Sequence, residues 1–206
     1  MALGQFCLEH EITIISDEIH SDLVFSGYKH TVLTSVSKEL EQNTVVCNAP
    51  SKTFNIAGIP ASNVIIANEK LRSSYRQVLR GSGLALPNVF AVTAVEAAYT
   101  YGEAWLDELL LYLEDNYRLA SSFIAERIPD IKVIEPEGTY LLWLDCRGLG
   151  LNDKELDSFI KEKAKLLLES GTIFGTGGSG FQRMNIACPR SLLLEALQRL
   201  EKAVRG

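Results

Sequence analysis

The fold class is indicated most clearly by one run near the start of the sequence, Ile12-Thr13-Ile14-Ile15-Ser16-Asp17-Glu18. Its apolar, β-branched residues end abruptly at two carboxylates, as expected of a strand buried in a sheet. Two further runs have the same character, Asn43–Asn48 and Asn63–Asn68. Because near-continuous apolar strands are typical of a sheet covered on both faces, the sequence predicts an α/β fold.

A long helix follows these strands. Apolar residues recur at three- and four-residue intervals over Trp105–Ile128, and Pro129 ends this pattern. Shorter helices are expected at Leu3–Glu9, Glu69–Leu79 and Asn88–Tyr101. With three strands and little helix between them, residues 1–128 are expected to form only part of a large domain, joined to the remainder by the long helix.

The sequence beyond Pro129 has a different organisation. Short strands mixed with helices are typical of a small α+β domain, which we assign to residues 129–206. The expected strands are Ile131–Ile134, Thr139–Asp145, Thr172–Phe174 and Gln182–Ala187. One helix is expected from Asp153 to Glu169, capped by Asn152, and another ends at Val204 and is capped by Ser191.

Composition excludes several classes of protein. Of the 206 residues, 47% are hydrophobic, so the chain is not disordered. The net charge of −6 disfavours nucleic acid as a partner, because phosphate backbones repel an acidic surface. No apolar run approaches the ~20 residues of a membrane span, and the first residues lack the features of a signal peptide. Four scattered cysteines form no metal-binding pattern with the three histidines, which favours free thiols in the cytoplasm and no metal site.

Three residues are candidates for chemistry from their positions alone. Asp17 ends an apolar strand, where open α/β sheets bind ligands, although a solvated strand end is the simpler interpretation. Lys52 follows another such strand; partial desolvation there would make its amine nucleophilic, whereas most lysines are only solvated surface. Arg183 lies within an expected strand and could bind a carboxylate bidentately or form a surface salt bridge. The glycine-rich stretch Gly175–Gly180 is interpreted as a loop, because it lacks the features of a phosphate-binding loop.

Four stretches together resemble the fold-type I pyridoxal-phosphate enzymes of the class I/II aminotransferase superfamily. They are Ser16–Leu23, Pro50–Gly58, Pro136–Asp145 and Arg183–Arg190. Within that superfamily, the sequence is most similar to the MalY/PatB group of cystathionine β-lyase-like C–S lyases. The similarity runs from Leu3 to Val204 and corresponds to the carboxyl-terminal half of a family subunit. It implies part of the large mixed-sheet α/β domain plus the small α+β domain.

The resemblance also implies roles for individual residues. Lys52 would bond the cofactor, pyridoxal 5′-phosphate, through its aldehyde, and Asp17 would pair with the pyridine nitrogen. His20 would contact the ring hydroxyl, and Arg183 would bind the α-carboxylate of an amino-acid substrate. The sequence departs from the family pattern at Ala49 and Pro60, which leaves Ser51 as the candidate for the cofactor phosphate.

Three functions stay open at this point. The closest resemblance implies a C–S β-lyase of amino-acid metabolism, which releases thiol, pyruvate and ammonia from cysteine-type amino acids. The same residues would serve an aminotransferase. A catalytically inert fragment, or a binding or regulatory module on the same scaffold, is the third alternative. The resemblance implies a homodimer for the full-length protein.

Overall fold

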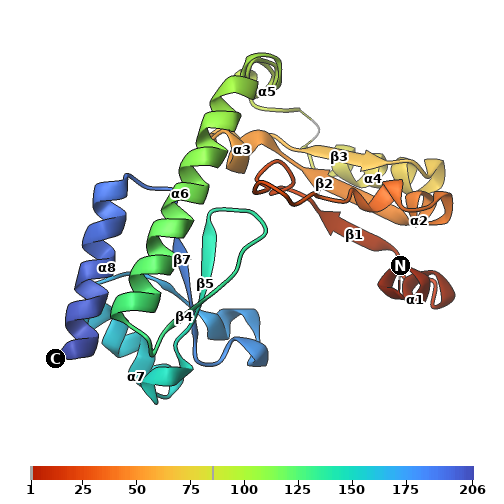
Figure 1. Cartoon of the computed structure of the whole chain (residues 1–206). Coiled ribbons are helices and arrows are strands. Elements are labelled where there is room, and N and C mark those ends of the chain that lie inside the picture. The colour runs from red at the N-terminus through yellow and green to blue at the C-terminus, as the bar shows by residue number, and fades with distance from the viewer. Residues whose placement is uncertain (1, 85) are drawn as a thin grey trace. The chain divides into compact units, whose positions relative to one another are not determined.

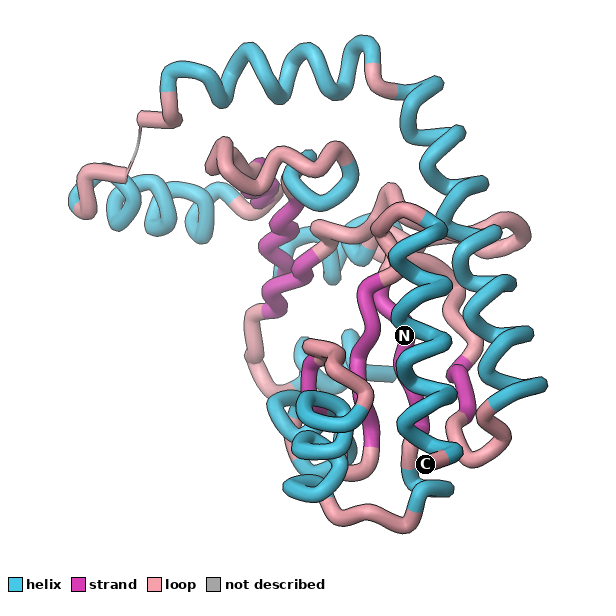
Figure 2. The backbone as a smooth tube through the Cα atoms, turned by 90° about the vertical axis from the view of Figure 1, so that its left-hand side faces the viewer, coloured by secondary structure: helices cyan, strands magenta, loops and turns pink. Residues whose placement is uncertain are grey.

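A computed structural model describes residues 2–84 and 86–206 of the chain (Figure 1). The chain divides into two compact units, Met1–Glu108 and Leu109–Gly206. The division falls inside the long helix α6, Glu103–Arg127. The presence of this helix confirms the long helix expected from sequence. The assignment of residues 1–128 and 129–206 to separate folding domains stays a prediction. Regular structure is mostly helical, and the strands form two separate small sheets (Figure 2).

The first unit contains a mixed sheet of three strands in the order β1-β2-β3. These strands are β1 (Ile14–Asp17), β2 (Thr44–Asn48) and β3 (Asn63–Ile66), which confirms the three apolar runs. β1 and β2 are parallel, with Asp17 beside Cys47, whereas β2 and β3 are antiparallel. The parallel pair brings the carboxyl ends of β1 and β2 to the same edge of the sheet.

Apolar strands of this kind are typical of a sheet covered on both faces, whereas the described residues leave part of each face open. On one face, Val46 is buried but its neighbour Ile65 is 54% exposed. On the other face, Ile66 is buried whereas Ile15 is 73% exposed. The described helices of this unit therefore cover each face only in part, and apolar strand residues reach solvent on both sides.

Side-chain caps fix where the helices of the first unit begin. Asn68 accepts hydrogen bonds from the backbone of Lys70 and Leu71, and Asn88 accepts one from Phe90. Gly102 separates the last two helices, and a Cβ there would lie 2.3 Å from the Phe54 ring. The helices are α1 (Ala2–Glu9), α2 (Lys38–Asn43), α3 (Pro50–Thr53), α4 (Glu69–Gly81) and α5 (Val89–Tyr101), with a 3₁₀ turn at Leu33–Ser35.

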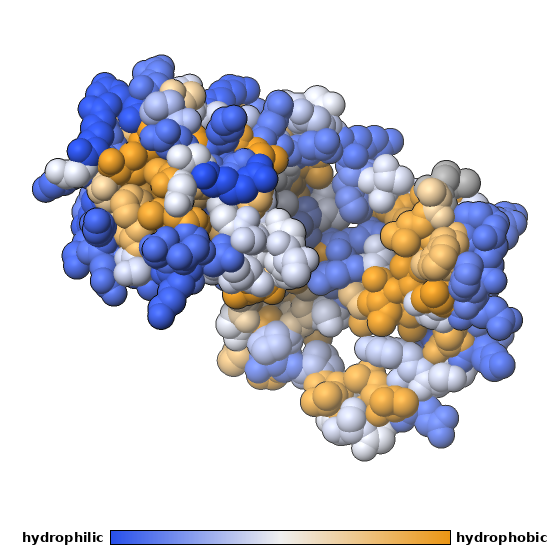
Figure 3. All heavy atoms as spheres, turned by 90° about the horizontal axis from the view of Figure 1, so that it is seen from below, coloured by the Kyte–Doolittle hydropathy of each residue, from blue (hydrophilic) through white to orange (hydrophobic). Residues whose placement is uncertain are grey.

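Helix α5 is apolar around most of its circumference yet has little cover in this chain. Only Ala91 is buried, whereas Val89 and Phe90 are 80% and 70% exposed. Apolar side chains reach the molecular surface in patches among the polar ones (Figure 3). No helix within residues 2–84 and 86–206 combines the length and apolar character needed to cross a membrane.

The second unit contains an antiparallel sheet with the order β4-β5-β7-β6. Its strands are β4 (Lys132–Ile134), β5 (Leu141–Asp145), β6 (Glu169–Ser170) and β7 (Phe181–Asn185). One face is core, where Leu142, Leu144 and Met184 are at most 2% exposed. Because strand side chains alternate, Trp143 and Arg183 point to the opposite face.

Helices close the core face of this sheet. α8 (Arg190–Arg205) runs alongside α6 (Figure 1), and Arg127 forms an ion pair with Glu201 at 3.7 Å. Asn116 on α6 is completely buried and donates hydrogen bonds to the carbonyl oxygens of Ile186 and Cys188. The remaining elements are 3₁₀ turns at Arg147–Leu149, η4 (Gly171–Phe174) and η5 (Thr176–Gly178), α7 (Asp153–Ser158) and the π-helical η3 (Phe159–Lys163).

Three sequence predictions in this unit are wrong. The helix from Asp153 ends at Lys163 rather than Glu169. It widens into a π turn over Phe159–Lys163, and Lys165, just beyond it, has a left-handed φ of 56° that no right-handed helix adopts. Thr172–Phe174 forms part of a 3₁₀ turn instead of a strand. The last helix starts at Arg190, before the expected cap Ser191.

Candidate functional site

The carboxyl ends of β1 and β2 bring two predicted site residues to one edge of the first sheet. Asp17 is the last residue of β1, and Lys52 lies in α3, four residues after the end of β2. The backbone N–H of Glu18 donates to the carbonyl of Cys47 at 2.7 Å, so pairing continues past the strand end. An acid and an amine are therefore carried on adjacent chain segments of the same unit.

Asp17 and Glu18 have different environments, as the alternation of strand side chains predicts. Asp17 is exposed, and its Oδ1 accepts a hydrogen bond from the Ile19 N–H at 3.2 Å. Glu18 is 6% exposed and accepts hydrogen bonds from Ser16, His30 and the Leu33 N–H. Burial would raise the pKa of Glu18, but these hydrogen bonds outweigh it and hold the pKa below its usual value. Glu18 anchors the loop, which leaves Asp17 as the carboxylate open to a ligand.

A partly buried hydrogen bond joins the loop after β1 to the helix that carries Lys52. The hydroxyl of Thr53, which is fully buried, donates to Asp22 Oδ2 at 2.9 Å. Burial and the charge of Asp22 together raise the pKa of Tyr99 on α5. Sequence analysis missed this link, because no local pattern pairs residues 31 positions apart.

The other predicted residues of this unit lie in the same region. Lys52 is exposed, so the partial desolvation expected for its amine is not found among the described residues. Ser51 is half-buried in the first turn of α3. His20 is half-buried in the turn after β1, where its carbonyl oxygen accepts a hydrogen bond from the Leu23 N–H at 3.0 Å.

Arg183 belongs to the second unit and lies on the open face of its sheet. Its guanidinium lies 4.6 Å from the centre of the Phe174 ring, and its Nε donates to Glu169 Oε2 at 2.6 Å. Burial raises the pKa of Tyr140, and the positive charge of Arg183 offsets part of that rise. The surroundings of Arg183 are aromatic and half-buried, a setting in which a guanidinium binds planar anions well.

A row of aromatic rings connects Arg183 to a second arginine on this face. Trp143 packs edge-on against Phe174 at 5.5 Å and stacks on Phe181 at 5.3 Å. Arg147 lies over Phe181 and forms a bidentate pair with Asp145, at 2.8 and 2.7 Å. Hydrogen bonds from Arg147 hold the pKa of Asp145 below its usual range. Two arginine–carboxylate pairs therefore flank the aromatic row.

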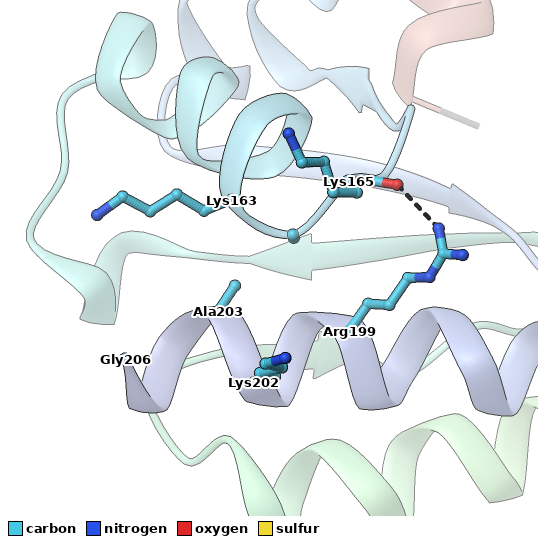
Figure 4. Close-up of a pocket in the computed structure, with 7 residues that line it drawn as sticks. Lys163, Lys165, Arg199, Lys202, Ala203 and Gly206 are labelled. Carbon is cyan, nitrogen blue, oxygen red and sulfur yellow. Dashed lines mark hydrogen bonds between the residues drawn. The ribbon is translucent and has the colours of Figure 1, made fainter.

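A pocket lined by cations lies elsewhere in the second unit, between η3 and α8 (Figure 4). Lys163 and Lys202 stand in the last turns of those two helices, and Arg199 donates to the carbonyl oxygen of Lys165 at 3.3 Å. Unpaired carbonyls at helix C-termini favour positive charge, which accounts for these lysines. Within the described residues, no group of His, Cys, Asp and Glu side chains is arranged to hold a metal ion.

Solved structures define the class of protein to which this fold belongs. Cystalysin of Treponema denticola, which contains pyridoxal 5′-phosphate, superposes with a TM-score of 0.95 and 37% identity, covering 98% of this chain and 52% of that one. A pyridoxal-phosphate-bound C–S lyase of Staphylococcus hominis gives a TM-score of 0.86 and 33% identity. The match covers 98% of this chain and 52% of the lyase chain. The fold is that of the pyridoxal-phosphate-dependent transferases.

The family follows from sequence comparison. The profile of the aminotransferase class I and II family matches residues 1–200, and the chain belongs to that family. Among its relatives, cystathionine beta-lyase PatB of Bacillus subtilis is 46% identical over 204 residues, which is 99% of this chain and 53% of PatB. Protein MalY of Escherichia coli is 35% identical over 99% of this chain and 52% of MalY. The chain spans about half the length of the curated relatives it matches.

Proposed function

We propose that this protein is a pyridoxal-phosphate-dependent C–S β-lyase. The observation that carries the proposal is the placement of Asp17 at the end of β1 and of Lys52 on the helix that follows the parallel strand β2, in a chain 46% identical to a cystathionine beta-lyase. The reaction is β-elimination from a cysteine-type amino acid. With one water it releases a thiol, pyruvate and ammonia.

The residues of the first unit fit the cofactor by their chemistry. Lys52 presents an exposed amine, which can bond an aldehyde, and Asp17 presents an exposed carboxylate, which can pair with a protonated pyridine nitrogen. When bound, pyridoxal phosphate supplies an electron sink for the carbanion formed at the substrate Cα. His20 and Ser51 lie on the same two segments and are proposed to contact the ring hydroxyl and the phosphate.

Each proposed residue then has a separate task. Asp17 would pair with the ring nitrogen of the bound cofactor and keep it protonated. The Thr53–Asp22 hydrogen bond holds the lysine-bearing helix against the loop after β1. The amine of Lys52 takes the proton from the substrate Cα. Arg183 binds the substrate α-carboxylate, a role favoured by its planar fork of donors.

An aminotransferase is the second candidate, because the same residues would serve transamination as well as release of a thiol. Aspartate aminotransferase of Bacillus subtilis is 29% identical over 210 residues. The higher identity to cystathionine beta-lyases favours the lyase.

The test compares products from cystathionine with and without an added keto-acid acceptor. We expect release of pyruvate that needs no acceptor. The rate of this release should fall by roughly 100-fold or more in Lys52→Ala, because one positioned acid–base group contributes a factor of that size. Lys70→Ala, on an exposed position of α4, is the matched control and should retain activity. Acceptor-dependent conversion without pyruvate would instead identify an aminotransferase.

We further propose that the protein acts in the cytoplasm on small amino acids and forms homodimers. Cys7, Cys47, Cys146 and Cys188 are free thiols, which suits a reducing compartment. The large exposed apolar surface of α5 suits contact with further protein.

A further inference from the structure

The guanidinium of Arg183 already holds a carboxylate from its own chain. β6 and β7 are antiparallel neighbours, and their register sets Glu169 beside Arg183. Nε of Arg183 donates to Glu169 Oε2 at 2.6 Å, and Nη2 contacts the same oxygen. The contact uses one side of the donor fork that would bind a substrate carboxylate.

This ion pair is open to exchange with carboxylates from solution. The side chain of Glu169 is 53% exposed and that of Arg183 is 28% exposed. Exposed ion pairs are weak, because water solvates both partners when they separate. Glu169 also stands on a strand of only two residues at the edge of the sheet, so moving its side chain disturbs little packing.

We propose that Glu169 is a resident counter-ion of Arg183 that competes with the substrate carboxylate and thereby sets the concentration at which substrate binds. The inference rests on the role of Arg183 proposed above. An incoming carboxylate must displace Glu169 or share the guanidinium with it. In both cases the negative charge of Glu169 lowers the affinity of the incoming carboxylate for Arg183. Glu169 touches no reacting atom, so it tunes substrate binding and leaves the chemical steps unchanged.

The same face of the sheet offers a matched control. Asp145 and Arg147 form a second arginine–carboxylate pair at the far end of the aromatic row. The Asp145→Asn change removes a charge of the same sign from the same face without altering the partner of Arg183. An effect specific to Glu169 is thereby separated from a general change in surface charge.

The first measurement is steady-state kinetics on the holoenzyme with cystathionine. Glu169→Gln should lower KM by roughly two- to fivefold, the range expected for an exposed ion pair, with kcat unchanged. Asp145→Asn should leave both constants unchanged. An unchanged or raised KM in Glu169→Gln overturns the proposal, and a raised KM would show that Glu169 orients Arg183 for the substrate.

The second measurement needs no turnover and no cofactor. Phenylglyoxal modifies accessible arginines, and mass spectrometry of the peptide that contains Arg183 gives its rate. Glu169→Gln should speed modification of Arg183, and propionate should protect it at a lower concentration than in the unmodified protein. Equal protection in both proteins overturns the proposal.

Failure of the proposed role of Arg183 would look different. If Arg183→Lys leaves KM unchanged and propionate does not protect Arg183 in either protein, then Arg183 is no carboxylate site, and both ideas fall. If Arg183→Lys raises KM and propionate protects, but Glu169→Gln behaves like the unmodified protein, only the role of Glu169 is overturned.

Discussion

At the scale of single residues, the hydroxyl of Thr53 links Lys52 to the rest of the candidate site. Thr53→Val keeps the shape of the side chain but leaves the carboxylate of Asp22 without this donor. We expect a loss of about 1–3 kcal/mol in the free energy of unfolding of this region, together with weaker retention of cofactor. Hydrogen exchange of α3 and the cofactor content after dialysis measure both effects. Thr53→Ser keeps the hydroxyl and should match the unmodified protein in both measurements. If Thr53→Val also matches it, the hydroxyl of Thr53 does not hold α3 in place.

Glu18 predicts how stability depends on pH. The pKa of Glu18 in the folded chain lies below the usual 4.5. Its contribution to the free energy of unfolding is therefore complete above pH 4.5 and is lost as the pH falls through the lower pKa of the folded chain. Glu18→Gln should therefore be less stable than the unmodified protein at pH 7, and this difference should shrink as the pH is lowered below 4.5. Melting temperatures of the two proteins across this range check the expectation. A difference that stays constant with pH would show that the anchor does not depend on the charge of Glu18.

Arg183 illustrates which parts of the site could be predicted from sequence. Its position within a strand, and those of Asp17 and Lys52 after apolar runs, were readable because strand ends and local patterns lie within short stretches. Glu169 was not readable as its partner, since that pairing depends on the register of β6 and β7. The exposure of Lys52 was equally unreadable, because burial depends on which distant elements cover a residue.

At the scale of elements, the turns η4 and η5 position Phe174 through one close backbone contact. A Cβ on Gly178 would lie 1.8 Å from the carbonyl oxygen of Gly171, whereas a Cβ on Gly177 would meet nothing within 4 Å. Gly178→Ala should therefore cost about 1–3 kcal/mol in stability, as overpacking does, and Gly177→Ala should cost little. Thermal unfolding of the two variants is the measurement. Equal melting temperatures would mean that the backbones separate without cost.

The same turns explain why one strand prediction failed. Ile173 and Phe174 have high strand propensity, but Gly171 and Gly178 allow a backbone approach that other residues forbid. The strands β1, β2 and β3 were predicted well, because β-branched residues with high strand propensity gather in each of them. The helix after Asp153 was predicted too long, since a π turn and a left-handed residue leave no periodic signal.

At the scale of the whole molecule, exposed apolar surface predicts association. Val89, Phe90 and Val92 on α5 are each at least 59% exposed, in addition to the uncovered strand residues Ile15 and Ile65. The 206-residue chain expressed by itself is expected to self-associate and to bind the dye ANS. Phe90→Lys should reduce both, as measured by size-exclusion chromatography with light scattering. A monomer that binds no dye would contradict the expectation.

The central claim is that Lys52 is the residue that bonds the cofactor. The most direct measurement is borohydride reduction of the protein after incubation with pyridoxal phosphate, followed by peptide mass mapping. We predict that the added mass lies on the peptide that contains Lys52, and that Lys52→Ala removes it while Lys70→Ala does not. Attachment at another lysine, or equal labelling in Lys52→Ala, would contradict the assignment of the site.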